Sequence, residues 1–289
     1  MTTLGVVFRP QFPPERLRTV AKVADETGLA ELWLWEDCFF ESGVATATAA
    51  LAWTERLRVG VSLLPVPLRN VALTSMEAAT LHRMFPDRAI LAVGHGVQSW
   101  MAQTGSRVES PLTLLREYLH AMRALLRGER VTTNGRYVRL DDVALEWPPP
   151  TAPPVFAGGI GPRTVELCGE AADGTVLDVI TTPDSLRESR ELINQGRAKA
   201  ARTDPHPIVV YLHTATGEGA AERLQGELKR RGQSPNLGVT GNAETVAAAV
   251  RALAEAGADT VVLEPTADEP DIEGFIRFAA KEVRLLLTP

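Results

Sequence analysis

The chain has 289 residues, 45% of them hydrophobic, so it can bury a large core as one large domain or two ordinary ones. A net charge of −6 without any Lys/Arg-rich run argues against a nucleic-acid surface. Two cysteines are too few for a disulfide framework or a metal site, and no apolar segment reaches the roughly 18 residues of a membrane span, so we expect a soluble, cytoplasmic protein.

The first third of the chain alternates short apolar runs with segments of helical periodicity. Glycine and proline residues stand between these segments, as is typical of the turns that join strands and helices. The predicted strands are Leu4–Phe8, Glu31–Trp35, Arg58–Leu64 and Ala89–Val93, and the predicted helices are Pro14–Thr27, Thr46–Thr54 and Val71–Met84.

The middle of the chain departs from this alternation. Pro111–Arg127 has the pattern of a strong helix, and Val131–Trp147 contains the turn sequence Asn134-Gly135, which predicts a small β-hairpin. There is no low-complexity linker. We therefore predict one domain over residues 1–289, with an inserted helix and hairpin near residues 97–150.

The alternation then resumes and continues to the end of the chain. Eight strand–helix units in about 250 residues favour an α/β fold of the (β/α)8 TIM barrel type over an open doubly wound sheet, and two half-size domains are the weaker alternative. The later strands are predicted at Val155–Ala157, Thr175–Ile180, Pro207–His213 and Asp259–Glu264, and the helices from Pro162 and at Pro183–Ala201, Glu218–Arg231, Ala243–Glu255 and Ile272–Leu287.

A glycine-rich loop joins the fifth predicted strand to the helix that begins at Pro162. Free amides and the positive end of the helix dipole favour an anion there, so a ligand phosphate fits over residues 160–164, with Arg163 adding a charge. A plain turn without a ligand explains the glycines equally well, and a Rossmann loop fits worse because the third glycine of GxGxxG is missing. The loop comprises Gly158, Gly159, Ile160, Gly161, Pro162, Arg163 and Thr164.

Polar side chains follow most of the predicted strands. In a barrel of this type the carboxyl ends of the strands meet at one mouth, where the chemistry is done. Each of these residues alone could be an ordinary solvent-exposed residue at the end of a strand. Their collection at one face of the barrel indicates a functional site. They are Arg9, Glu36, Asp37, Cys38, Ser62, His95, Asp178, His213 and Glu264.

Three of these residues are candidates for acid–base chemistry. His95 lies between two glycines, where a ligand can approach the backbone, although a structural histidine fits as well. Glu36 and Asp37 are adjacent, so like-charge coupling can tune a proton transfer, or either residue can cap the next segment. If the strand continues to them, at most one of the two faces the cavity.

Six segments, spread over nearly the whole chain, carry a likeness to a known family: AKVADETGLAELWLWEDCF, ERLRVGVSLLPVPLRN, TLHRMFPDRAILAVGHG, LLREYLHAMRALLRGERVTTNGRYVRL, GPRTVELCGEAADG and GNAETVAAAVRALAEAGADTVVL. In their order and spacing they resemble the bacterial luciferase-like, flavin-dependent oxidoreductases, and within that family the branch that uses coenzyme F420. No single segment is diagnostic.

The resemblance implies that F420, with FMN as the alternative, binds at the mouth of the barrel and exchanges a hydride with a small organic substrate. It implies a non-proline cis peptide at Ser62-Leu63 behind the cofactor ring, and a homodimer by family habit. The cofactor-binding positions that it implies are Ser62, Leu63, Leu64, His95 and Gly96 for the ring, and Ile160, Gly161, Arg163 and Thr164 for the phosphate.

The chain also departs from the family pattern. Sugar-phosphate and alcohol dehydrogenases of the F420 branch carry Asp-His where this chain has Glu36-Asp37, and a glutamate where it has Val97. The usual acid–base pair is therefore missing, which leaves Glu36, Asp37 and His95 as candidates.

Three other functions remain open at this point. An FMN-dependent monooxygenase is the nearest alternative enzyme, and a non-catalytic flavin or F420 binder is the alternative from another class. A barrel enzyme that acts on a phosphorylated metabolite without a flavin is supported by the phosphate loop alone. No GxSxG, HExxH, Walker loop or ligand-spaced Cys/His group supports a serine hydrolase, a zinc enzyme or a P-loop protein.

Overall fold

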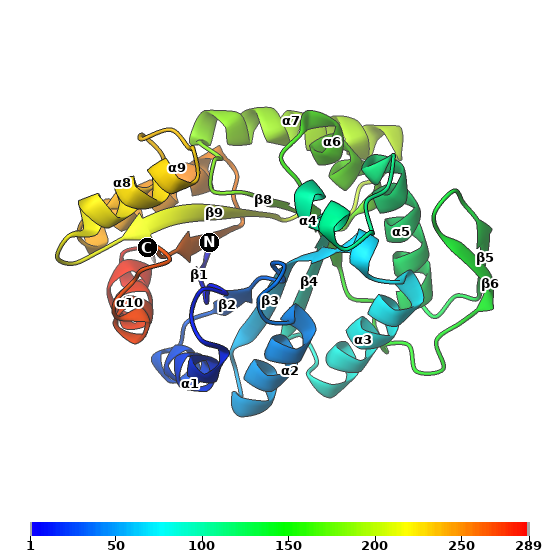
Figure 1. Cartoon of the computed structure of the whole chain (residues 1–289), viewed down its shortest axis with the longest axis horizontal. Coiled ribbons are helices and arrows are strands. Elements are labelled where there is room, and N and C mark those ends of the chain that lie inside the picture. The colour runs from blue at the N-terminus through cyan, green and yellow to red at the C-terminus, as the bar shows by residue number, and fades with distance from the viewer. Residues whose placement is uncertain (1, 288–289) are drawn as a thin grey trace.

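A computed structural model describes residues 2–287, and within them eight parallel strands close into a barrel (Figure 1). In chain order these strands are β1 (Thr3–Val7), β2 (Glu31–Leu34), β3 (Arg58–Pro65), β4 (Ala89–Gly94), β7 (Val155–Gly158), β8 (Gly174–Leu177), β9 (Ile208–Ala215) and β11 (Thr260–Glu264). The barrel closes because β9 pairs with both β8 and β11, while β11 pairs with β1. A short strand, β10 (Val239–Thr240), pairs with the end of β9. The predicted (β/α)8 fold is confirmed.

Helices connect the strands and cover the outside of the barrel (Figure 1). Along residues 2–287, no helix combines the length and the hydropathy that crossing a bilayer demands. The covering helices are α1 (Leu17–Thr27), α2 (Gly43–Trp53), α3 (Val71–Met84), α5 (Pro111–Leu126), α6 (Pro162–Ala171), α7 (Pro183–Lys199), α8 (Ala220–Arg230), α9 (Ala243–Ala256) and α10 (Ile272–Phe278).

Two helices differ most from the prediction. α2 begins at Gly43 rather than at Thr46, because the side chain of Ser42 accepts a hydrogen bond from the amide of Ala45 and caps an earlier first turn. The closing helix is not one α-helix over 272–287. After α10 the chain continues as a π-helical turn at Ala279–Val283 and a 3-10 turn at Arg284–Leu286.

The segment between β4 and β7 holds a short helix, α4 (Gln98–Gln103), then α5, and then an antiparallel hairpin of β5 (Val131–Asn134) and β6 (Arg139–Val143). Figure 1 shows α5 in the ring of helices, between α3 and α6, with the hairpin outside the ring. The expected hairpin is therefore present. The expected helix of the insertion takes the place of a regular barrel helix, so the additions to the barrel are α4 and the hairpin.

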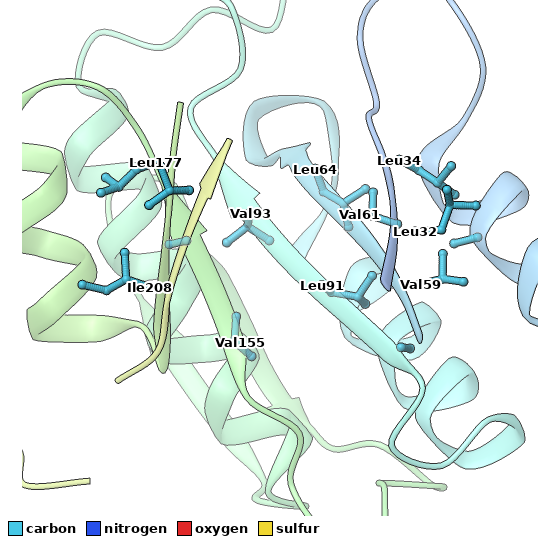
Figure 2. Packing of buried hydrophobic residues seen from close by; sticks show 14 of the residues in the cluster. Leu32, Leu34, Val59, Val61, Leu64, Leu91, Val93, Val155, Leu177 and Ile208 are labelled. Carbon is cyan, nitrogen blue, oxygen red and sulfur yellow. The ribbon is translucent and has the colours of Figure 1, made fainter. Parts of the chain in front are cut away.

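Side chains that alternate along the strands build two apolar layers, because both faces of a parallel barrel sheet are buried. The inner layer is dominated by Trp33, which has room because Gly5 and Gly60 lie beside it: a Cβ on Gly60 would come within 2.5 Å of its ring. The outer layer packs against the helices. Figure 2 labels Leu32, Leu34, Val59, Val61, Leu64, Leu91, Val93, Val155, Leu177 and Ile208 from this outer layer.

Two glycines bring the backbones of α6 and α7 into contact. A Cβ on Gly169 of α6 would overlap the carbonyl oxygen of Ile193, and one on Gly196 of α7 would overlap the carbonyl oxygen of Glu166. Neither carbonyl can move without opening its helix. The close approach of these helices therefore depends on the missing side chains.

We expect Gly196→Ala to lower the free energy of unfolding by about 1–3 kcal/mol, because the new methyl group pushes α7 away from α6. Chemical denaturation monitored by circular dichroism measures this change. Gly226→Ala in α8 is the matched control: the nearest atom to its new Cβ is Arg230 Nη1 at 3.4 Å, so the gain in helix propensity should raise the free energy of unfolding by about 0.5–1 kcal/mol. Equal effects of the two substitutions would contradict this account of the α6–α7 contact.

Candidate active site

A cavity of about 690 Å³ opens at the carboxyl ends of the barrel strands. Its walls come from the end of β3, from the loops that follow β2, β4, β7 and β8, and from α4, together with side chains from β9 and from the end of α8. Seven of the residues predicted for catalysis or cofactor binding line it: Glu36, Asp37, Ser62, Leu63, His95, Gly96 and Ile160. The strand-end residues Cys38 and Asp178 line it as well.

Four residues predicted to bind the cofactor do not line this cavity. Leu64 is 1% exposed and packs in the outer layer of the core (Figure 2), which corrects the prediction for its side chain. Gly161 and Arg163 are exposed at the start of α6, and Thr164 is buried in its first turn. For these three residues, a role at the phosphate remains a prediction.

A bulge in β3 forms one wall of the cavity. The peptide bond between Ser62 and Leu63 is cis, as the resemblance implies, and the pairing of β3 with β4 shifts between Val61 and Leu64. The side chain of Leu63 lies against two glycines. A Cβ on Gly94 would come within 2.5 Å of Leu63 Cδ1, and one on Gly158 within 3.1 Å of Leu63 Cδ2. These glycines therefore make the slot that Leu63 fills.

Glu36 is fully engaged by other protein groups. Arg69 Nη1 donates to Glu36 Oε1 at 2.8 Å, and the Gly43 amide donates to Glu36 Oε2 at 2.9 Å. Arg69 also pairs with Glu77. Glu36 thus fixes the start of α2 and the loop after β3. Its contacts do not support the predicted role in proton transfer.

Asp37 has a different environment, although it is the next residue. β2 ends at Leu34, so strand alternation no longer separates the two side chains, and both border the cavity. Among residues 2–287, no hydrogen bond or ion pair engages the Asp37 carboxylate. Burial raises the pKa of Asp37, and Asp178 adds to the effect, while Arg231 and Arg9 oppose it. Asp37 is thus the candidate that remains available for proton transfer.

His95 is held in place from two sides. Its Nε2 lies 2.9 Å from Thr164 Oγ1, and the side-chain amide of Gln98 donates to the carbonyl oxygens of His95 and Gly96 at 3.2 and 3.3 Å. Burial lowers the pKa of His95, partly offset by the carbonyl of Pro111, so the ring is neutral at neutral pH. Its Nδ1 is buried.

A buried charge cluster, defined as Arg9, Glu227, Arg231 and Glu264, lies behind the cavity. Arg231 pairs with Glu264 Oε1 at 2.8 Å and with Glu227 Oε1 at 2.9 Å, and Arg9 donates to Glu227 Oε1 at 2.9 Å. The guanidinium carbons of Arg9 and Arg231 lie 5.6 and 6.0 Å from the centre of the Trp35 ring. Within the cluster, only Arg231 reaches the cavity.

Three strand-end residues that the sequence predicted at the mouth of the barrel lie in the charge cluster or next to it. Arg9 is 2% exposed, and His213 and Glu264 are fully buried, so none of them lines the cavity. Burial raises the pKa of Glu264 to about 7, although Arg231 and Arg9 oppose the effect. Burial lowers the pKa of His213 to about 4, with Arg231 adding to it.

Tyr211 and Arg231 are among the cavity-lining side chains that sequence reasoning missed. Tyr211 projects from the middle of β9, where it is the one hydroxyl-bearing ring in an otherwise apolar strand segment, and this is a weak signal. Arg231 follows α8 and reaches the cavity only through the charge cluster, which no local pattern reveals. The described residues include no group of three or more His, Cys, Asp or Glu that could hold a metal ion.

Comparison with known proteins finds similar enzymes, two of which are described first. The chain is 28% identical over 208 residues to 5,10-methylenetetrahydromethanopterin reductase of Methanolobus tindarius, covering 72% of this chain and 63% of the relative. It is 30% identical over 214 residues to F420-dependent glucose-6-phosphate dehydrogenase of Kineococcus radiotolerans, covering 67% and 63%. The chain therefore spans less than two thirds of the length of these relatives.

The same fold occurs in a solved structure, that of the coenzyme F420-dependent tetrahydromethanopterin reductase from Methanopyrus kandleri, with a TM-score of 0.86, 20% identity and 99% of each chain covered. The model of the luciferase-like monooxygenase family matches residues 3–230, which is most of the chain. The chain therefore belongs to the luciferase-like monooxygenase family.

Proposed function

We propose that this protein binds F420 in the cavity and catalyses hydride transfer between F420 and a small organic substrate. The observation that supports the proposal most strongly is the set of residues that line the cavity. The Leu63 bulge and the start of α6 flank one side, and the unpaired carboxylate of Asp37 stands at the other. The similarity to F420-dependent glucose-6-phosphate dehydrogenase and to the coenzyme F420-dependent tetrahydromethanopterin reductase supports the choice of cofactor.

The residues present fit such a cofactor. At the start of α6 no side chain caps the first turn, and no atom lies within 4 Å of where a Cβ on Gly161 would sit, so a phosphate can approach the free amides. Arg163 is exposed beside them.

F420, when bound, supplies the reversible transfer of a hydride at its ring. The protein then has to hold the substrate and move one proton, since oxidising an alcohol or an amine releases both a hydride and a proton. We assign the proton to the carboxylate of Asp37, which lines the cavity and has no competing partner among the described residues. Leu63, Ser62 and His95 would hold the ring.

We expect Gly161→Asp to weaken F420 binding about tenfold or more, because it places a carboxylate at the positive end of α6 where the phosphate would bind. Titration with F420, followed by the fluorescence of its ring, measures the affinity. Gly161→Ala is the matched control and should bind F420 as the natural protein does, since the site is open and its φ of −78° suits any residue.

The same titration with FMN separates the alternatives. Tighter binding of FMN than of F420 would overturn the choice of cofactor in favour of an FMN-dependent monooxygenase. Binding of neither compound would refute the flavin assignment altogether. F420 binding without turnover on any substrate would leave a non-catalytic binder and contradict the enzymatic part of the proposal.

We expect Asp37→Asn to lower kcat/KM for substrate oxidation about a hundredfold, the usual range for loss of a general base, while F420 affinity is unchanged. In the natural protein kcat/KM should rise with pH as Asp37 ionises, at a pH above the usual 3.8, because burial raises its pKa. The rise should vanish in the variant. Reduction of F420 with a panel of secondary alcohols and amines provides the assay.

The outcome against Asp37 is equally specific. Glu264, with a pKa of about 7, is the other carboxyl near this site that titrates late. If the pH dependence persists in Asp37→Asn and disappears in Glu264→Gln, the proton passes through Glu264 and the assignment to Asp37 is wrong.

A further inference from the structure

Arg231 is the member of the charge cluster that lines the cavity, and its guanidinium is bound on one edge. Its Nε lies 2.9 Å from Glu227 Oε1, and its Nη2 donates to Glu264 Oε1 at 2.8 Å. The third nitrogen, Nη1, makes no hydrogen bond or ion pair with any residue in 2–287, and the side chain is 27% exposed. Because a guanidinium is a planar fork with five N–H donors, the opposite edge keeps donors for a ligand in the cavity.

The position of this guanidinium is fixed by charge and by packing. Glu227 and Glu264, which hold its Nε and Nη2, are both buried. Its central carbon lies 6.0 Å from the centre of the Trp35 ring, which also lines the cavity. A donor that is in place before the substrate arrives needs no rearrangement on binding. This is the condition under which a protein dipole or charge stabilises a transition state most strongly.

The two glutamates do not cancel the charge of Arg231, because other arginines share them. Glu227 also accepts hydrogen bonds from Arg9 and Arg230, both at 2.9 Å. Glu264 lies 3.5 Å from Arg9. Burial raises the pKa of Glu264 to about 7, so this carboxyl is only partly ionised at neutral pH. Arg231 therefore keeps positive charge that it can offer to a ligand.

Asp37 lines the same cavity and lies within the electrostatic reach of Arg231. Burial raises the pKa of Asp37, and the charge of Arg231 opposes this effect more than that of any other group. The two side chains make no ion pair with each other. A fixed donor and an unpaired carboxylate thus line one cavity. Oxidation of an alcohol needs this combination, since a base takes the hydroxyl proton while a donor stabilises the oxygen.

We propose that Arg231 binds the oxygen on the reacting carbon of the substrate, so that the site takes a substrate with a hydroxyl or carbonyl group there and rejects the corresponding amine. The inference rests on the proposed function and names the substrate class of the same site. A guanidinium carries donors and a permanent charge but no acceptor. It therefore binds the lone pairs of a hydroxyl or carbonyl oxygen, whereas a protonated amine presents only donors and a like charge.

The step balances in the direction of oxidation, with oxidised F420 as the electron acceptor. The C–H bond at the reacting carbon breaks, and its hydride passes to the cofactor ring. The O–H bond breaks as well: its proton passes to Asp37, and its electron pair forms the second bond of the carbonyl. Arg231 Nη1 donates to this oxygen throughout and stabilises the negative charge that develops on it. In the direction of reduction, the same contact polarises the carbonyl.

Arg231→Lys tests the contact, because lysine keeps a positive charge between the two glutamates but lacks the second edge of the guanidinium. We expect this variant to lower kcat/KM for oxidation of cyclohexanol by F420 about a hundredfold. Infrared spectroscopy of bound, isotope-labelled cyclohexanone provides a readout that a merely structural role would not change. The carbonyl stretch should lie at lower frequency in the natural protein than in Arg231→Lys, since the hydrogen bond from Arg231 polarises the carbonyl.

Arg230→Lys is the matched control. Arg230 pairs with the same Glu227, but it is 56% exposed and does not line the cavity. This variant should keep the kcat/KM and the carbonyl frequency of the natural protein. An unchanged carbonyl frequency in Arg231→Lys, in a protein with the natural thermal stability, would refute the contact.

A second measurement needs no variant and therefore holds even if Arg231→Lys does not fold. Isothermal titration calorimetry compares cyclohexanone with cyclohexylamine, which has the same ring and is a cation at neutral pH, on the whole natural protein. We expect the ketone to bind at least about tenfold more tightly than the amine. Equal or tighter binding of the amine, or no binding of the ketone, would overturn the proposal.

Titration with F420 keeps this inference distinct from the proposed function. F420 affinity should be unchanged in Arg231→Lys. If F420 binds and the shift of the carbonyl stretch is missing, the inference about Arg231 fails and the cofactor assignment stands. If F420 does not bind and the shift is present, the contact with Arg231 stands and the function as an F420 enzyme fails.

Discussion

The pairing of Arg231 with two buried glutamates is the interaction on which the chemistry of this cavity depends. Charges removed from water are stable only when each has a partner in good geometry. Arg231 meets this condition through Glu227 and Glu264, and it also lies against Trp35. Arg231 also borders the cavity, where its charge and that of Arg9 offset part of the effect of burial on the pKa of Asp37. The network thus fixes the aromatic wall of the cavity beside Asp37.

The opposite side of the cavity depends on packing rather than on charge. Leu63 turns into the barrel at the β3 bulge because Gly94 and Gly158 leave a slot for it, whereas Leu64 turns outward into the core (Figure 2). Thr164, in the first turn of α6, contacts His95 and so links the glycine loop to the loop after β4. One side of the cavity is therefore apolar and rigid, which suits a planar ring, and the other is acidic, which suits a polar substrate.

The barrel could be predicted because strands buried on both faces leave apolar runs, such as Ala89–Val93, which glycine and proline separate from helices. The roles of the individual site residues could not be predicted from the sequence in the same detail. Glu36 and Asp37 look alike in the sequence, and only the folded chain brings Arg69 to one of them. Likewise, the burial of Glu264 and of Tyr211 arises from neighbours distant in sequence. The α6 loop was identified because its signal, glycines before a helix, is local.

A crystal structure of the protein with F420 tests the central claim most directly. The account predicts the deazaflavin ring against Leu63 and near His95, the phosphate at the start of α6 beside Gly161, and open space left between the ring and Asp37 for a substrate. A ring bound elsewhere, or a phosphate held by Arg231 in place of Glu264, would contradict the account and reverse the assignment of the two sides of the cavity.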